Sequence, residues 1–134
     1  MGRGGAAGGG AGGGVTFTAR NWDEQLANET NLLQNAAAEL ARPIPAGNNT
    51  EMARRARTAA QLERRTLNTL RRNERPPIGG LWQPRAYTQG AARFGRASAE
   101  FRAGNFNAAR SEMNAARDGF REYGGSLKRV MKEE

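Results

Sequence analysis

The residues with the most distinctive chemistry in this sequence are arginines gathered in one stretch. Residues 49–75 hold eight arginines and three glutamates, in a chain of 134 residues with a formal net charge of +8. A guanidinium group stays charged and presents a planar fork of donors that matches a phosphate or a carboxylate. The stretch therefore indicates a nucleic-acid contact, a contact with an acidic protein, or only the solvated face of an ordinary helix.

Helical spacing places most of these arginines on one side. At about 100° per residue, seven of them fall within a sector of roughly 120°, and only Arg55 lies outside it. This arginine stripe consists of Arg54, Arg57, Arg64, Arg65, Arg71, Arg72 and Arg75. The opposite face carries Met52, Ala56, Ala59, Ala60, Leu67 and Leu70. We therefore predict an amphipathic helix whose arginine stripe is the contact surface.

Codon composition offers a competing explanation for the arginine excess. Only two of the 21 basic residues are lysines, and alanine, glycine and arginine dominate the chain. The codons of these three residues are rich in G and C, so a GC-rich genome would favour arginine over lysine without selection for guanidinium chemistry. Both explanations are open on the sequence.

The composition argues against an enzyme. The chain has no histidine and no cysteine, which removes imidazole proton transfer, cysteine nucleophiles and the usual zinc sites. Aspartate occurs only at positions 23 and 118, and no Gly-Lys-Ser/Thr phosphate loop is present. We therefore predict no catalytic, cofactor-binding or metal-binding residues. Because no run of about 18 apolar residues occurs, we also expect no membrane partner and a cytoplasmic location.

The elements that must position the arginine stripe begin after a glycine-rich segment. Residues 2–14 contain only glycine, alanine and one arginine, so they have no side chains with which to build a core. Residues 1–17 are therefore predicted to be a disordered arm, with Val15 and Phe17 as an entry to the core. Residues 18–134 are predicted to form one helical domain.

A first helical hairpin is predicted over residues 21–72. Its first helix should run from about residue 22 to residue 42, since Asn21 and Glu24 have capping-box spacing and Pro43 ends the pattern. Its buried line consists of Leu26, Leu33, Ala37 and Leu40.

The second helix of this hairpin carries the arginine stripe. Asn48 and Glu51 repeat the capping-box spacing, and the short connection 43–48 predicts that this helix is the antiparallel partner of the first. Glu63 falls in the middle of the apolar face, where an unpaired carboxylate is costly. We expect either an ion pair with an arginine of a neighbouring helix or an open face at this point.

A linker rich in proline and glycine follows over residues 73–85. It carries Trp82, which we interpret either as a binding anchor or as a cap on the open end of a small core. A second hairpin is predicted over residues 86–123, with a tight turn at Gly104. Its buried lines are Tyr87, Ala91, Phe94, Ser98 and Phe101, then Phe106, Ala109, Met113, Ala116 and Phe120.

Glycines mark two further features of the second hairpin. Gly90 and Gly95 predict a close helix crossing, and Gly124 with Gly125 should end the fourth helix. Residues 124–134 would then be a C-terminal tail, in which Ser126 could start a short helix through Met131. The fold class predicted is all-α, a small antiparallel bundle of about four helices. Its thin core makes a homo-oligomer a possible partner arrangement.

Two segments resemble known proteins. "AEFRAGNFNAARSEMNAA" (residues 99–116) resembles the middle of a tetratricopeptide unit, which implies a helical hairpin with a tight glycine turn. Only one unit is present, and Arg93 stands where that family places tryptophan, so a peptide-binding solenoid is not implied. "MGRGGAAGGGAGGG" (residues 1–14) resembles the glycine-rich starts of small prophage proteins of gut bacteria, which implies a phage or mobile-element origin.

The function predicted from these features is non-catalytic binding. The arginine-striped helix would contact nucleic acid or a nucleoprotein complex, within a bacterial host cell if the protein is phage-encoded. Proteins of the prophage kind include virion components, DNA-associated factors and inhibitors of host defence. The alternatives are therefore an inhibitor of a host defence nuclease of the anti-CRISPR type, acting by protein–protein contact, and a virion structural or scaffold component.

Overall fold

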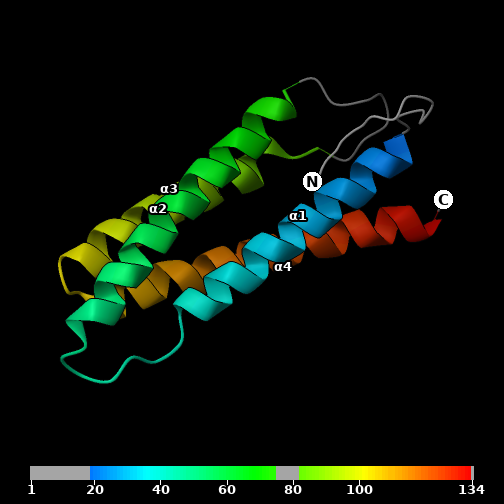
Figure 1. Ribbon diagram of the computed structural model, residues 1–134. Helices are drawn as coiled ribbons and strands as arrows, with labels where there is room; N and C mark the ends of the chain where they lie inside the picture. The colour runs from blue at the N-terminus through cyan, green and yellow to red at the C-terminus, as the bar shows by residue number, and fades with distance from the viewer. Residues whose placement is uncertain (1–18, 75–81, 134) are drawn as a thin grey trace.

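The computed structural model describes residues 19–74 and 82–133, and within them the side chains of residues 22–74 and 82–129. This part of the chain is helical and contains no strand. Its helices are α1 (Ala19–Leu40), α2 (Asn49–Arg72), α3 (Pro84–Arg102) and α4 (Phe106–Glu133). Figure 1 shows them packed lengthwise, with successive helices running in opposite directions. The predicted all-α bundle is confirmed, whereas the predicted arm over residues 1–17 lies outside the described residues.

The close neighbour of α2 is α3, not α1. α2 packs against α3, α3 against α4, and α4 against α1, whereas α1 and α2 approach each other closely at few positions (Figure 1). α2 therefore runs antiparallel to α1, as the short connection predicts, but it packs most closely against α3. The reason is side-chain size. Gly95 of α3 leaves room for Glu63 of α2, whereas the long side chains of Arg55 and Arg65 stand between α2 and α1.

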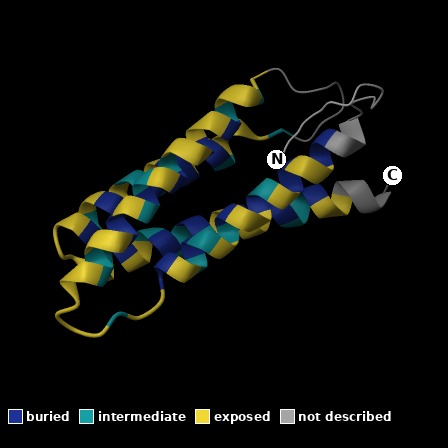
Figure 2. Ribbon diagram, viewed as in Figure 1, coloured by how far each residue is buried: buried dark blue, intermediate teal, exposed yellow. Residues whose placement is uncertain are grey.

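The core is built mainly from α1, α3 and α4. Figure 2 shows the buried residues on the inward faces of the helices and the exposed residues outside. The largest apolar side chains with almost no exposure are Leu33, Tyr87, Phe94, Phe101, Met113, Phe120 and Leu127. The predicted buried lines of these three helices are therefore confirmed, with Phe106 half-buried at the start of α4.

Two glycines do what their positions predict. A Cβ atom on Gly90 would lie only 2.2 Å from Cζ of Phe120, so α3 and α4 can cross closely there only without that atom. Gly104 has a φ of +81°, a conformation that glycine adopts without strain, and it forms the tight turn between α3 and α4.

The fourth helix does not end at Gly124. α4 continues to Glu133, so the predicted end of the fourth helix at Gly124 is wrong, although the residues after Ser126 are helical as expected. Two packing contacts explain the continuation. A Cβ on Gly124 would lie 3.5 Å from the side chain of Thr30 in α1, and Leu127 is completely buried one turn later. This tertiary packing outweighs a helix cost of about 1 kcal/mol per glycine.

The two predicted capping boxes have different outcomes. α1 begins at Ala19, so Asn21 lies inside the helix and does not cap it, because Ala19 and Arg20 are themselves good helix formers. At α2 the prediction is confirmed: the side chain of Asn48 accepts a hydrogen bond of 3.0 Å from the backbone N–H of Glu51. The start of the arginine-rich helix is thereby fixed.

No helix within the described ranges combines the length and the apolar character that a bilayer-spanning helix needs.

Candidate nucleic-acid interface

The arginine stripe forms much of the exposed face of α2. All of its members within the described residues are exposed, namely Arg54, Arg57, Arg64, Arg65, Arg71 and Arg72. Arg75 lies outside the described residues. The stripe faces solvent because the opposite side of α2 buries Ala56, Ala59 and Leu62 against the bundle.

No carboxylate interrupts the exposed face of α2 between Met52 and Arg72. The helix contains two glutamates. Glu51 lies in its first turn, and the carboxylate of Glu63 lies against Gly95 of α3. Beyond its first turn the exposed face of α2 therefore carries arginines and no carboxylate of its own, an arrangement that favours an anionic partner.

Two arginines of the stripe are already paired with carboxylates. Arg65 donates two hydrogen bonds of 2.8 Å to Glu29 of α1, one from Nε and one from Nη2. Arg54 donates to Glu51 in the same fork geometry, at 2.8 and 2.7 Å. Both pairs still leave the Nη1 group of the guanidinium without a carboxylate partner, because arginine has five N–H donors.

The pKa shifts of these carboxylates follow from the pairs. Burial alone would raise the pKa of Glu29, but hydrogen bonds from Arg65 and Thr69 and the charges of Arg65 and Arg72 outweigh it and lower the pKa below its usual value. Hydrogen bonds from Arg54 and Arg55 lower the pKa of Glu51 to about 2. Both side chains are therefore anionic at neutral pH.

The other four arginines have no carboxylate within ion-pair distance among the described residues. The side chains of Arg57 and Arg64 make no hydrogen bond with a described residue. Arg71 donates to the side-chain oxygen of Asn68 at 2.7 Å, and Arg72 donates to the hydroxyl of Thr69 at 3.3 Å. We call Arg57, Arg64, Arg71 and Arg72 the open arginines, because their charge is not neutralised within the described structure.

Arg55 has a structural role that the sequence analysis did not assign. Its side chain is buried, and Nη1 donates to the backbone carbonyl of Leu40 at 3.1 Å and to that of Arg42. Leu40 is the last residue of α1 and Arg42 follows it in the connection, at a point where a helix end leaves carbonyls without partners. Nε of Arg55 also donates to Glu51 at 2.7 Å. One sign of this role was present in the sequence, because Arg55 is the arginine of residues 49–75 that lies outside the stripe.

Leu67 is a correction to the predicted apolar face. It is 46% exposed, whereas Thr66 and Thr69 are buried. Leu67 lies about 100° around the helix from Thr66, which is enough to move it out of the inward face. Both threonine hydroxyls donate to carbonyls one turn back in α2, to Leu62 and Arg65, so their burial leaves no donor unsatisfied.

The ion pair expected for Glu63 is not formed within the described part of the chain. The side chain is half-buried, and its Oε2 lies where a Cβ on Gly95 would come within 2.4 Å. The face is not open at this point either, because Gly95 of α3 lies against the carboxylate and the missing side chain of this glycine makes room for it.

Trp82 packs against the bundle. Its ring lies edge-on to Trp22, with the centroids 5.9 Å apart, and beside Tyr87 at 5.2 Å. Trp22 in turn donates from its indole nitrogen to Asn73 at 2.6 Å, which ties the start of α1 to the end of α2. These contacts match the interpretation of Trp82 as a cap on the core.

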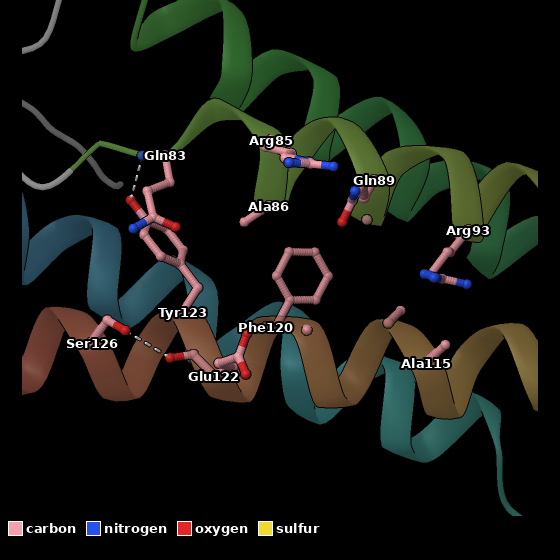
Figure 3. Close-up of a pocket in the computed structure, with 13 residues that line it drawn as sticks. Gln83, Arg85, Ala86, Gln89, Arg93, Ala115, Phe120, Glu122, Tyr123 and Ser126 are labelled. Atoms are coloured by element: carbon pink, nitrogen blue, oxygen red, sulfur yellow. Dashed lines mark hydrogen bonds between the residues drawn. The ribbon is translucent and has the colours of Figure 1, made fainter.

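A pocket lies between α3 and α4. Figure 3 shows this pocket of about 240 Å³, with the ring of Phe120 between the two helices. Its rim carries both cationic and anionic side chains, Arg85 and Arg93 against Glu122. Arg93 is already held by Glu112 of α4 at 3.2 Å. The pocket therefore does not select one charge, in contrast to the arginine stripe.

Comparisons with known proteins add no assignment to this geometry. The chain matches no protein-family model, no curated protein and no solved structure.

Proposed function

We propose that this protein binds nucleic acid through the arginine stripe of α2 and performs no catalysis. The observation that carries the proposal is the exposed face of α2, which presents six arginines and, beyond the first turn, no carboxylate of its own. A helix of 24 residues is about 36 Å long. Its charges therefore form a line long enough to contact several successive phosphates of a nucleic-acid strand. An anionic polymer complements such a line better than a single small anion does.

The chemistry of α2 favours contact with phosphates over stacking on bases. No aromatic residue occurs between Asn49 and Arg72, and proteins that grip single strands stack bases on aromatic side chains. Guanidinium groups, in contrast, bind phosphate oxygens through paired hydrogen bonds. A double-stranded partner, whose bases are already stacked, therefore fits this surface.

The salt dependence of binding tests the proposal. We would measure the affinity of the full chain for a fluorescent duplex by anisotropy at several salt concentrations. The test variant replaces the four open arginines, Arg57, Arg64, Arg71 and Arg72, with glutamine. The control variant carries the same substitution at four other arginines, Arg85, Arg102, Arg110 and Arg129. These arginines lie exposed on α3 and α4 and also lack a carboxylate partner among the described residues.

The two variants lose the same charge but should behave differently. Each phosphate neutralised contributes about 0.9 to the slope of log affinity against log salt, so losing four contacts should flatten the slope by about 3 to 4. The control should keep most of the slope. Equal losses in both variants would mean that general charge, not α2, attracts the nucleic acid. No binding of wild type to any nucleic acid at low salt would refute the proposal.

An acidic protein could use the same stripe, and nuclease treatment distinguishes the two partners. If the stripe binds nucleic acid, partners captured from a lysate by wild type but not by the test variant should be lost after nuclease digestion. Partners that persist would support the alternative, contact with a protein.

A further inference from the structure

The geometry of α2 points to a more specific partner, the major groove of duplex DNA, with Gln61 and Asn68 facing the base edges. This inference rests on the proposed function, because it concerns the same helix face. It adds that the surface reads sequence, whereas the phosphate contacts proposed above do not depend on sequence.

The exposed face of α2 has three parallel lines. One line consists of Arg57, Arg64 and Arg71, seven residues apart in each step. The opposite line consists of Arg54, Arg65 and Arg72. Between the two lines lie Gln61 and Asn68, which are both exposed and also seven residues apart. At about 100° per residue the arginine lines are roughly 90° apart around the helix, with the two amides between them.

This arrangement matches the cross-section of a major groove. The groove is about 12 Å wide and admits an α-helix with its side chains. The most outward side chains of an inserted helix meet base edges, and those on either flank reach the phosphates of the two strands. The amides at the centre of the face would therefore lie opposite base edges, and the guanidinium groups on both flanks would lie opposite phosphates.

The central side chains have the chemistry for base recognition. Asparagine and glutamine pair with the N6 and N7 atoms of adenine through two hydrogen bonds. Arg71 donates to the Oδ1 of Asn68 at 2.7 Å, which orients the amide, and a second lone pair of that oxygen remains for the adenine amino group. The side chain of Gln61 makes no hydrogen bond with a described residue and can turn toward a base.

The spacing along the helix sets the spacing of the bases. Seven residues correspond to a rise of about 10.5 Å along α2. Base pairs of DNA follow at about 3.4 Å, so the two amides would meet positions about three base pairs apart. Duplex RNA has a deep, narrow major groove that excludes a helix, and it should therefore not satisfy this arrangement.

The flanking lines differ in how freely they can reach phosphates. The three arginines of the first line have no carboxylate partner among the described residues. In the second line, Arg54 and Arg65 are partly occupied by Glu51 and Glu29 and offer their Nη1 groups. The first line should therefore provide more of the phosphate contact than the second.

Selection from a random duplex tests the inference. The full wild-type chain, the variant Q61A/N68A and the control N28A/N35A would each select from a library of DNA duplexes with a randomised centre. Asn28 and Asn35 are exposed asparagines of α1, also seven residues apart. Affinities for the selected duplex, a scrambled duplex and a duplex RNA of the same sequence would then be compared, together with their salt slopes.

We expect wild type and the control to enrich adenines about three base pairs apart and to prefer the selected duplex about tenfold or more, since one bidentate pair is worth a factor of this order. Q61A/N68A should lose the preference to within about twofold and keep the salt slope of wild type, because its phosphate contacts are intact.

Three outcomes would overturn the inference. Binding of duplexes by wild type without enrichment would do so and leave the proposed function standing. Equal affinity for duplex RNA would exclude insertion into a major groove. A preference that survives in Q61A/N68A would assign the reading to other residues. Failure of wild type to bind any nucleic acid would instead remove the proposed function itself.

Discussion

Arg65 and Glu29 are joined by two parallel hydrogen bonds of 2.8 Å that bridge α2 and α1. These are the two helices that follow each other in sequence without packing closely. The pair therefore does two things. It fastens helices that otherwise share few close contacts, and it holds one member of the arginine stripe partly away from an external partner.

The substitution Glu29→Gln should separate these two effects. Because Glu29 is 14% exposed and Arg65 is half exposed, loss of the pair should lower the free energy of unfolding by about 1 kcal/mol in urea titrations. Affinity for duplex DNA should rise, since Arg65 is released and a negative charge beside the stripe is removed. Glu39→Gln on the same helix is the control, as the ion pair of Glu39 among the described residues is with its exposed neighbour Arg42. Unchanged or weaker DNA binding by the Glu29 variant would contradict the expectation.

Acid should destabilise the protein in part through the same carboxylate. The pKa of Glu29 is lowered in the folded protein, so its contribution to stability is present above the pKa of the unfolded chain and disappears as pH falls through the folded value. Thermal unfolding between pH 7 and acid should therefore show a smaller loss of Tm for Glu29→Gln than for wild type. Parallel curves for the two proteins would show that Glu29 is not linked to folding.

Arg55 should matter for stability more than any member of the stripe. Replacement by methionine keeps the buried stem but leaves the carbonyls of Leu40 and Arg42 without a donor and Glu51 without one of its two partners. Leaving a buried acceptor unsatisfied costs about 1–3 kcal/mol, so a loss in that range is expected. The control Arg57→Met removes an exposed arginine and should change the free energy of unfolding little. Equal costs at the two positions would refute the role assigned to Arg55.

Two glycines on the facing helices α3 and α4 should respond to alanine in opposite directions. Gly90→Ala places a Cβ 2.2 Å from Phe120 in the core, and overpacking of this kind costs about 1–3 kcal/mol. Gly119→Ala meets nothing within 4 Å in α4, so it should stabilise the protein by up to about 1 kcal/mol through helix propensity. Urea unfolding of both variants measures the difference. A gain in stability from Gly90→Ala would show that the two helices do not cross as closely as described.

The sequence predicted the helices better than it predicted their neighbours. Periodicity and caps depend on local residues, so the stripe of α2 and its start at Asn48 were accessible. The choice of α3 over α1 as the partner of α2 was not, because it depends on how a small residue such as Gly95 meets a larger one across helices. The continuation of α4 through Gly124 could not be predicted for the same reason. It depends on the tertiary packing of Leu127, which local helix propensity does not contain.

The candidate interface shows the same division. The outward direction of the arginines follows from helical spacing alone. Which of them are open does not, because Glu29 comes from α1 and approaches Arg65 only in the folded bundle. Arg55 is the clearest case. It follows Arg54 of the stripe directly, yet its side chain is buried and donates a hydrogen bond to a carbonyl at the end of α1. No motif in the sequence indicates this contact.

The two tyrosines provide a spectroscopic test of the core. The chain contains only Tyr87 and Tyr123, and both are buried. Burial raises the pKa of Tyr123 to about 12 and that of Tyr87 higher still, although each hydroxyl also has a hydrogen-bond partner. A folded pKa above the unfolded value of about 10 means that the tyrosines stabilise the fold below pH 10 and that this stability is lost as pH rises through the folded values. Tyrosinate absorbance and the loss of helical circular dichroism should therefore rise together, well above pH 10. Full tyrosinate absorbance near pH 10 in a protein that keeps its helices would contradict this expectation. It would mean that solvent reaches both hydroxyls and that the core between α3 and α4 is looser than the burial of the tyrosines indicates.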